Sequence, residues 1–202
     1  LKVVEETKTI QVKDGTGLIL LSNVAPEAYC SDYTINLITT NGWDVTKSVS
    51  LENKTYKFLG LGDETHPYQG SFKLDESTSS LQYSVTTARA LFNSLSTDAT
   101  FETEIPFMIS DSSSSEKPLL TENLKKGRKN SSLTCRLVLR EPNSSVSDAK
   151  IGGLIGTMET NTGADITFEN EVKSDLTVKG ESHMGLFCNT MQTGASLTAT
   201  FE

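Results

Sequence analysis

The chain has 202 residues, of which 36% are hydrophobic, and its formal net charge is −8. The length suffices for one domain or one repeat array with its own core, and no apolar run approaches the ~18 residues of a membrane-spanning helix, so we expect no membrane insertion. The acidic charge argues against nucleic-acid binding, because phosphate backbones are negative and the one basic cluster, residues 125–129, has the composition of a loop.

The first third of the chain has its own pattern. Ile10 and Val12 alternate with polar residues, which predicts a strand; residues 17–28 predict one or two helical turns, and residues 33–37 alternate again. We expect residues 1–57 to form an N-terminal capping unit, because a repeat array needs an atypical unit to close the end of its core. The chain begins with Leu1 and lacks a signal-peptide pattern, so we interpret it as an excised or processed piece.

A short motif then recurs with a period of about 33 residues. Its copies share a Thr-aromatic step, with Cys replacing the aromatic residue once, and they are offset by 34, 33 and 33 residues. The copies are Thr100-Phe101, Thr134-Cys135, Thr167-Phe168 and Thr200-Phe201. A second, looser row of leucines lies upstream of the steps and consists of Leu91, Leu119, Leu154 and Leu186.

The residues around each step alternate between apolar and polar side chains, as in Leu133, Cys135 and Leu137. Alternation with period two is typical of strands, and the Thr-Pro-Leu-His signature of ankyrin repeats is absent. We therefore expect an all-β fold, a single-stranded right-handed parallel β-helix (β-solenoid) with an N-terminal capping unit, in which residues 58–202 form coils of about 33 residues. The Thr-aromatic steps predict one inward stack: Phe101, Cys135, Phe168 and Phe201.

Six short segments occur in a fixed order along the chain. They are Tyr33-Thr-Ile-Asn-Leu37, Trp43-Asp-Val45, Phe58-Leu-Gly-Leu-Gly62, Pro67-Tyr-Gln-Gly-Ser-Phe72, Ala90-Leu-Phe-Asn-Ser-Leu95 and Gly152-Gly-Leu-Ile-Gly156. This order resembles the right-handed parallel β-helix surface proteins of gut bacteria that carry GLUG-type repeats. The resemblance implies an extracellular location and an adhesin-like or scaffold role. The chain departs from that pattern at residues 73–77, which weakens any transfer of site residues.

The cysteines and histidines do not predict a reactive centre. Cys135 occupies a core position, so we interpret it as a small buried hydrophobe. Cys30 and Cys188 lie at opposite ends of the expected stack, and a disulfide needs Cα atoms within ~7 Å, so we expect free thiols. His66 and His183 lack the spacing of a metal pair. Asp63 and Glu64 lie near His66 in the sequence, which is compatible with a metal site or with acid–base chemistry. The simpler interpretation is that His66 is a solvated loop residue. We therefore assign no metal or cofactor.

Carboxylates offer the only catalytic alternative. Glu102, Glu104, Glu169 and Glu171 fall on the outward side of the expected strands, where copies from different coils would line up. Because many β-helix proteins are polysaccharide lyases or glycoside hydrolases, an enzyme is one hypothesis, but outward polar residues are also what alternation requires. Trp43 and Tyr68 are candidates for a platform on which sugar rings stack. The alternative is that Trp43, the lone Trp, is a core residue.

We expect a non-catalytic extracellular domain of a bacterial cell-surface protein, adhesin-like or a scaffold or spacer, that presents a face to glycans or to host or bacterial surface proteins. The alternative is a polysaccharide lyase or glycoside hydrolase on a β-helix. No catalytic residue is assigned. The chain stops one residue after the core position Phe201, so we also expect more chain or a partner to cover the last coil.

Overall fold

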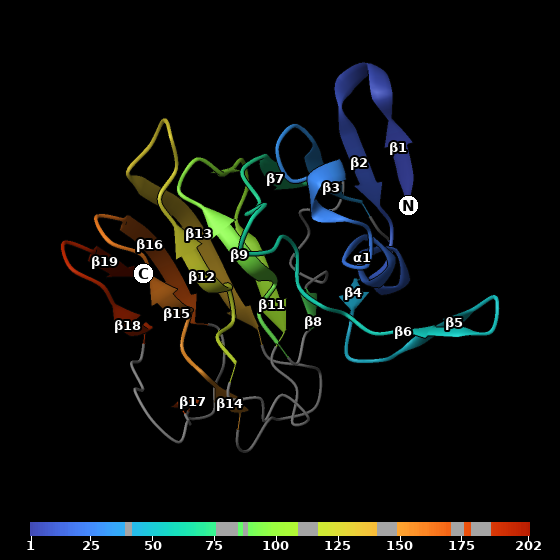
Figure 1. Ribbon diagram of the computed structural model, residues 1–202. Helices are drawn as coiled ribbons and strands as arrows, with labels where there is room; N and C mark the ends of the chain where they lie inside the picture. The colour runs from blue at the N-terminus through green and yellow to red at the C-terminus, as the bar shows by residue number, and fades with distance from the viewer. Residues whose placement is uncertain are drawn as a thin grey trace.

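The structure is a computed structural model that describes residues 1–38, 42–75, 85–86, 89–108, 117–140, 149–170, 176–178 and 187–202. It is mostly β, with strands in five separate sheets (Figure 1). Within these residues α1 (Gly15–Leu21) is the only α-helix, and two 3₁₀ turns, η1 (Glu5–Thr7) and η2 (Pro26–Ala28), flank it in the chain. The Asp14 carboxylate begins α1 by accepting a hydrogen bond from the N–H of Gly17 at 2.7 Å.

The N-terminal sheet mixes antiparallel and parallel pairs. Its strands, in spatial order, are β1 (Lys2–Val4), β2 (Thr9–Val12), β3 (Thr34–Leu37), β7 (Ser71–Leu74) and β10 (Thr100–Phe101). β1 runs antiparallel to β2, whereas the other three pairs are parallel. Between β1 and β2, Lys8 adopts a left-handed conformation (φ 48°) after η1, and the chain reverses there. The predicted strands around Ile10 and residues 33–37 are confirmed as β2 and β3.

Two larger sheets contain only parallel pairs. The six-stranded sheet has the spatial order β19 (Ser196–Phe201), β16 (Gly163–Asn170), β13 (Ser132–Arg140), β11 (Ile105–Met108), β8 (Val85–Thr86) and β4 (Trp43–Asp44). The four-stranded sheet has the spatial order β18 (Cys188–Met191), β15 (Ile155–Met158), β12 (Thr121–Lys125) and β9 (Phe92–Ser96).

Two small sheets complete the fold. β14 (Ala149–Ile151) and β17 (Leu176–Val178) form a parallel pair. β5 (Val49–Leu51) and β6 (Lys54–Tyr56) form an antiparallel hairpin that projects from the body of the molecule (Figure 1). Glu52 (φ 49°) and Asn53 (φ 63°) both have positive φ at its tip, as a two-residue turn between right-twisted strands favours.

The 33-residue repeat is visible in the register of the parallel strands, where residues about one period apart lie opposite each other. Gly163 lies opposite Ser196 and Ile155 lies opposite Cys188, so both pairs are offset by 33 residues. Phe168 lies opposite Phe201, with ring centroids 5.8 Å apart, as the repeat predicts. The repeat therefore specifies which strands become neighbours.

The predicted single-stranded β-helix is wrong. The strands belong to several separate sheets, one of which contains an antiparallel pair, and they form no single solenoid. The inward stack also fails at two of its four positions. Phe101 lies opposite Phe72 in the N-terminal sheet, and Cys135 lies opposite Ile166 because β13 pairs with β16 two residues out of the predicted register. A shift of two residues keeps each side chain on the same face, so alternation alone does not prevent it.

The hydrophobic core is one cluster that includes residues from Ile10 to Phe168. In the leucine row, Leu91, Leu119 and Leu154 are all buried, and the N–H of Leu91 donates to the carbonyl of Leu119 at 3.0 Å; Leu186 lies outside the described residues. β18 and β19 are the outermost strands of their sheets, and Phe201 is 60% exposed there.

Candidate functional site

The outward carboxylates that the structure describes are held in ion pairs. Arg136, on β13, binds two of them and also Glu202: its guanidinium lies 3.3 Å from Glu104, 3.2 Å from Glu169 and 2.7 Å from Glu202. The hydrogen bond that Arg136 donates to Glu202 raises the pKa of Arg136, and so do the charges of Glu202 and Glu104 and the hydrogen bond to Glu169, although desolvation opposes them. Glu102 is paired instead with Lys73, at 3.2 Å. Glu171 lies outside the described residues.

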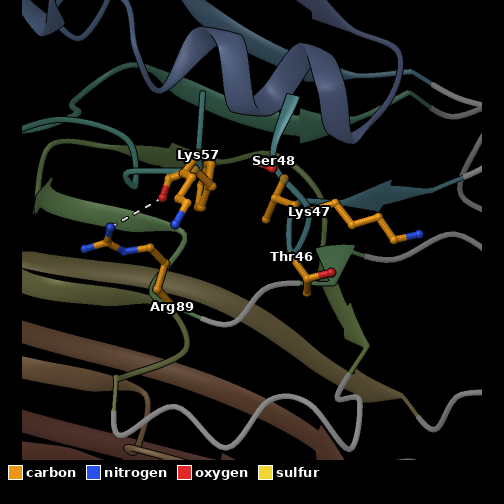
Figure 2. A pocket seen from close by; sticks show the side chains of 7 residues that line it. Thr46, Lys47, Ser48, Lys57 and Arg89 are labelled. Carbon is orange, nitrogen blue, oxygen red and sulfur yellow. Dashed lines mark hydrogen bonds between the residues drawn. The ribbon is translucent and has the colours of Figure 1, made fainter. Parts of the chain in front are cut away.

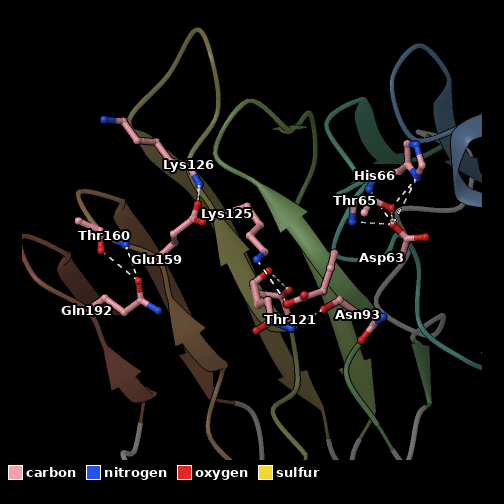
Figure 3. Close-up of polar contacts among 12 residues, drawn as sticks. Asp63, Thr65, His66, Asn93, Thr121, Lys125, Lys126, Glu159, Thr160 and Gln192 are labelled. Carbon is pink, nitrogen blue, oxygen red and sulfur yellow. Dashed lines mark hydrogen bonds and ion pairs between the residues drawn. The ribbon is translucent and has the colours of Figure 1, made fainter.

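The candidate residues around His66 form a hydrogen-bonded turn (Figure 3). The Asp63 carboxylate accepts hydrogen bonds from the N–H groups of Thr65 (2.9 Å) and His66 (2.6 Å). Partial desolvation acts to raise the pKa of Asp63, but these hydrogen bonds outweigh it, so the pKa is lowered. Neighbouring Glu64 pairs with Lys125 of β12 at 3.5 Å. The Asp63 carboxylate thus holds the turn, and Glu64 connects it to a strand 61 residues further along the chain. His183 lies outside the described residues.

All three cysteines have free thiols. Cys30 and Cys135 are buried, and burial raises the pKa of each thiol to about 12. Cys188 is half-buried, and desolvation raises its pKa as well. The thiolate is the nucleophile in cysteine chemistry, so these environments favour the unreactive form.

Trp43 and Tyr68 are both fully buried, so neither offers a ring face to a sugar. The indole N–H of Trp43 donates to the carbonyl of Val12 at 3.1 Å. The Tyr68 hydroxyl donates to the carbonyl of Tyr33 at 3.0 Å and accepts from the N–H of Ile35 at 3.2 Å. These bonds satisfy the polar ends of two large core side chains.

The basic cluster at residues 125–129 begins on the last residue of β12 and continues into a loop that is held by Asp98. The Asp98 carboxylate accepts hydrogen bonds from the N–H groups of Arg128 (2.8 Å), Lys129 (2.9 Å) and Asn130 (2.7 Å). Desolvation acts to raise the pKa of Asp98, but these three bonds outweigh it, so the pKa is lowered. Nothing in the local sequence around Asp98 indicated this role, because its partners lie about one repeat further along the chain.

Similar bonds join the next loops in Figure 3. Glu159 accepts from the N–H of Lys126 at 2.8 Å, and the Gln192 side chain accepts from the N–H of Thr160 at 3.1 Å. Each bond spans 32 or 33 residues of sequence. The loops on this edge are therefore attached to one another, repeat by repeat.

A cavity of about 280 Å³ lies where the β5–β6 hairpin joins the body of the molecule (Figure 2). Three basic side chains, two hydroxyl side chains and two apolar side chains line it: Lys47, Lys57, Arg89, Thr46, Ser48, Val45 and Phe58. Figure 2 shows Lys57 and Arg89 on one side of the cavity, Thr46 and Ser48 on the other, and Lys47 extending away from it. No local sequence motif indicates this site, because its residues come from three separate segments of the chain.

A second cavity, of about 300 Å³, lies beside β3 and β7 and is lined by Asn36, Lys73, Leu74, Asp75, Glu102 and Thr103. Asn36 is 8% exposed, and its side-chain oxygen has no hydrogen-bond partner. The Lys73–Glu102 ion pair occupies this cavity, and Thr103 accepts a hydrogen bond from the N–H of Leu74 at 2.8 Å. Most of its polar side chains are thus already paired.

No family model matches the chain, and neither does any curated protein or solved structure. Within the described segments, no helix has the length and apolar character that crossing a membrane requires. The described part of the chain also contains no group of three His, Cys, Asp or Glu side chains arranged to hold a metal ion.

Proposed function

We propose that the chain is a non-catalytic, extracellular binding and scaffold module of a bacterial cell-surface protein, with glycans as its partners. The observation that carries the proposal is the pairing of the outward carboxylates: Glu104 and Glu169 bind Arg136, and Glu102 binds Lys73. The sequence resemblance to surface proteins with GLUG-type repeats supports the location and the adhesin-like role.

The pairing bears on the glycoside hydrolase alternative through the chemistry of glycoside hydrolysis. That reaction uses two carboxyl groups on either side of the scissile bond, one of which must keep a proton near neutral pH. A neighbouring cation does the opposite, because it favours the charged form of a carboxylate. The carboxylates of this face are suited to holding neighbouring strands together.

A single incubation tests the proposal. The purified chain is mixed with pectin, alginate and glycosaminoglycans, and both bound polymer and newly formed ends are measured. We expect saturable binding to at least one polymer without new reducing or unsaturated ends. Release of such ends would show an enzyme, and failure to bind any polymer would remove the proposed partner class.

We also propose that a further strand, from more chain or from a partner, covers the outer edges of β18 and β19. Support comes from the apolar side chains at this end: Met191 is 46% exposed, Phe201 is 60% exposed, and Phe187 and Leu197 are only partly buried. An uncovered edge of this kind readily pairs with another strand.

A further inference from the structure

The cavity below the β5–β6 hairpin carries positive charge on an acidic protein. The chain has a net charge of −8, yet basic side chains outnumber acidic ones around this cavity. Two of the three cations have acidic partners: Lys47 pairs with Asp44 at 3.8 Å, and Arg89 shares Glu122 with Lys117, at 3.3 Å from each. Among the described residues Lys57 forms no ion pair.

Arg89 is fixed in place at the cavity wall. One of its guanidinium nitrogens donates to the carbonyl of Phe58 at 3.3 Å, and another binds Glu122 at 3.3 Å. These two bonds orient the planar group before any ligand arrives. A guanidinium held in this way loses little further freedom when it binds an anion.

The remaining lining suits a sugar ring. Val45 and Phe58 are each 5% exposed and form an apolar floor, and Ser48 supplies a hydroxyl. The second hydroxyl is oriented, because Thr46 donates to the Asp44 carboxylate at 2.6 Å and keeps its lone pairs available. Ligand cavities usually exceed about 300 Å³, so a cavity of about 280 Å³ fits a single charged sugar residue rather than a longer stretch of chain.

We propose that this cavity binds the anionic group of an acidic saccharide, a carboxylate or a sulfate. Lys57 and Arg89 bind the charged oxygens, Thr46 and Ser48 contact the sugar hydroxyls, and Val45 and Phe58 contact the ring. The inference rests on the proposed function, in that it takes the partner to be a glycan. The segments that line the cavity, residues 45–48 and 57–58, directly flank the projecting hairpin in the chain.

Calorimetric titration of the full chain tests the proposal, with glucuronate, glucose 6-sulfate, glucose and inorganic sulfate as separate ligands. We expect one or both acidic sugars to bind, neutral glucose not to bind, and affinity to fall as salt screens the charges. Glucuronate and glucose 6-sulfate distinguish the carboxylate source from the sulfate source.

Two nearby lysines provide the variants: Lys54 lies on β6, and Lys57 follows the end of that strand. Lys57→Gln removes a charge from the cavity, and we expect it to weaken binding about fivefold to tenfold, as loss of one charge-assisted contact does. Lys54→Gln is the matched control, because Lys54 is exposed on β6 but does not line the cavity, and we expect unchanged affinity. Both side chains are exposed, so both variants should fold, which circular dichroism checks.

Three results overturn the inference: no acidic sugar binds, Lys57→Gln and Lys54→Gln behave alike, or inorganic sulfate binds as tightly as the acidic sugars. Different results would contradict the proposed function, namely that the chain cleaves polymers or that it binds none of them. Polymer binding that is insensitive to Lys57→Gln leaves the proposed function intact and removes only this site.

Discussion

At the scale of single residues, Asp98 shows how one side chain joins two repeats. Its carboxylate binds three consecutive N–H groups of the loop at residues 128–130. The charged form is the better acceptor, which is why the pKa of Asp98 is lowered although desolvation opposes it. A lowered pKa in the folded state means that this contribution is present above the unfolded value of about 4 and is lost as the pH falls through the folded value.

We predict that Asp98→Asn lowers the free energy of unfolding at pH 7 by about 1 kcal/mol, after allowance for solvent screening of an exposed carboxylate. The difference from the wild type should shrink as the pH falls below about 4, because Asp98 then takes up a proton more readily in the unfolded chain than in the folded protein. Urea unfolding at pH 7 and at a pH of about 3 measures this. Asp32→Asn, at an exposed turn residue, is the control. A loss that is equal at both pH values would contradict the charge-based account.

Arg136 leads to a prediction about the outward face. Arg136→Gln leaves Glu104, Glu169 and Glu202 near one another without their shared cation. We expect a small loss of thermal stability that largely disappears in 1 M NaCl, because salt screens repulsion between exposed charges. Arg128→Gln removes an exposed Arg that makes no ion pair among the described residues, and thermal unfolding should not distinguish it from the wild type. A salt-independent loss for Arg136→Gln would show a packing role instead.

Single positions differed in how far the sequence could predict them. Cys135 is buried as its place in the repeat predicts, because hydrophobic alternation specifies which face a residue occupies. The register opposite Ile166 was not predictable, because a slip of two residues preserves that face. The cavity residues Thr46, Lys57 and Arg89 meet only after the chain folds, so no local pattern indicates them.

At the scale of elements, β19 is an edge strand with which another chain can pair. The N–H groups of Ser196 and Glu202 donate to β16 or its flanks, at 2.9 and 3.2 Å. Alternate residues of a parallel strand donate to the same side, so the N–H of Ala199 points to the free edge. This geometry leaves the edge available without any change in the β16–β19 pairing.

We predict that the purified chain self-associates with rising concentration through this edge. Ala199→Pro should weaken the association, because it removes an outward N–H and leaves the ladder to β16 intact. Ala199→Val keeps the N–H and should associate like the wild type. Sedimentation velocity measures all three proteins. A wild type that stays monomeric at high concentration would contradict the prediction.

The strands themselves were largely predictable, whereas their division into sheets was not. The alternating residues around Thr134, Thr167 and Thr200 lie in β13, β16 and β19. The repeat period does not indicate where the chain reverses its direction. Lys8 turns β1 back on β2, and positive φ at Glu52 and Asn53 creates a hairpin between repeats. Such turns depend on a few residues with unusual backbone conformations, which hydrophobic periodicity does not reveal.

At the scale of the whole molecule, separate sheets share one hydrophobic core, and the polar bonds between repeats lie on the surface around it. The cross-repeat bonds, such as Lys126 to Glu159 and Arg136 to Glu169, join segments 33 residues apart. The resulting scaffold supports a hairpin with a positively charged cavity at its base (Figures 1 and 2). Rigidity of the scaffold and access at the hairpin are the two properties that a binding module requires.

The most direct test of this account is an NMR titration of the labelled chain with acidic oligosaccharides, followed by mass spectrometry of the recovered ligand. We predict saturable shifts centred on the amides of residues 45–48, 57–58 and 89, with the oligosaccharide recovered intact. Shifts centred elsewhere, or recovery of shortened or unsaturated fragments, would contradict the claim that the chain binds acidic saccharides at this cavity without cleaving them.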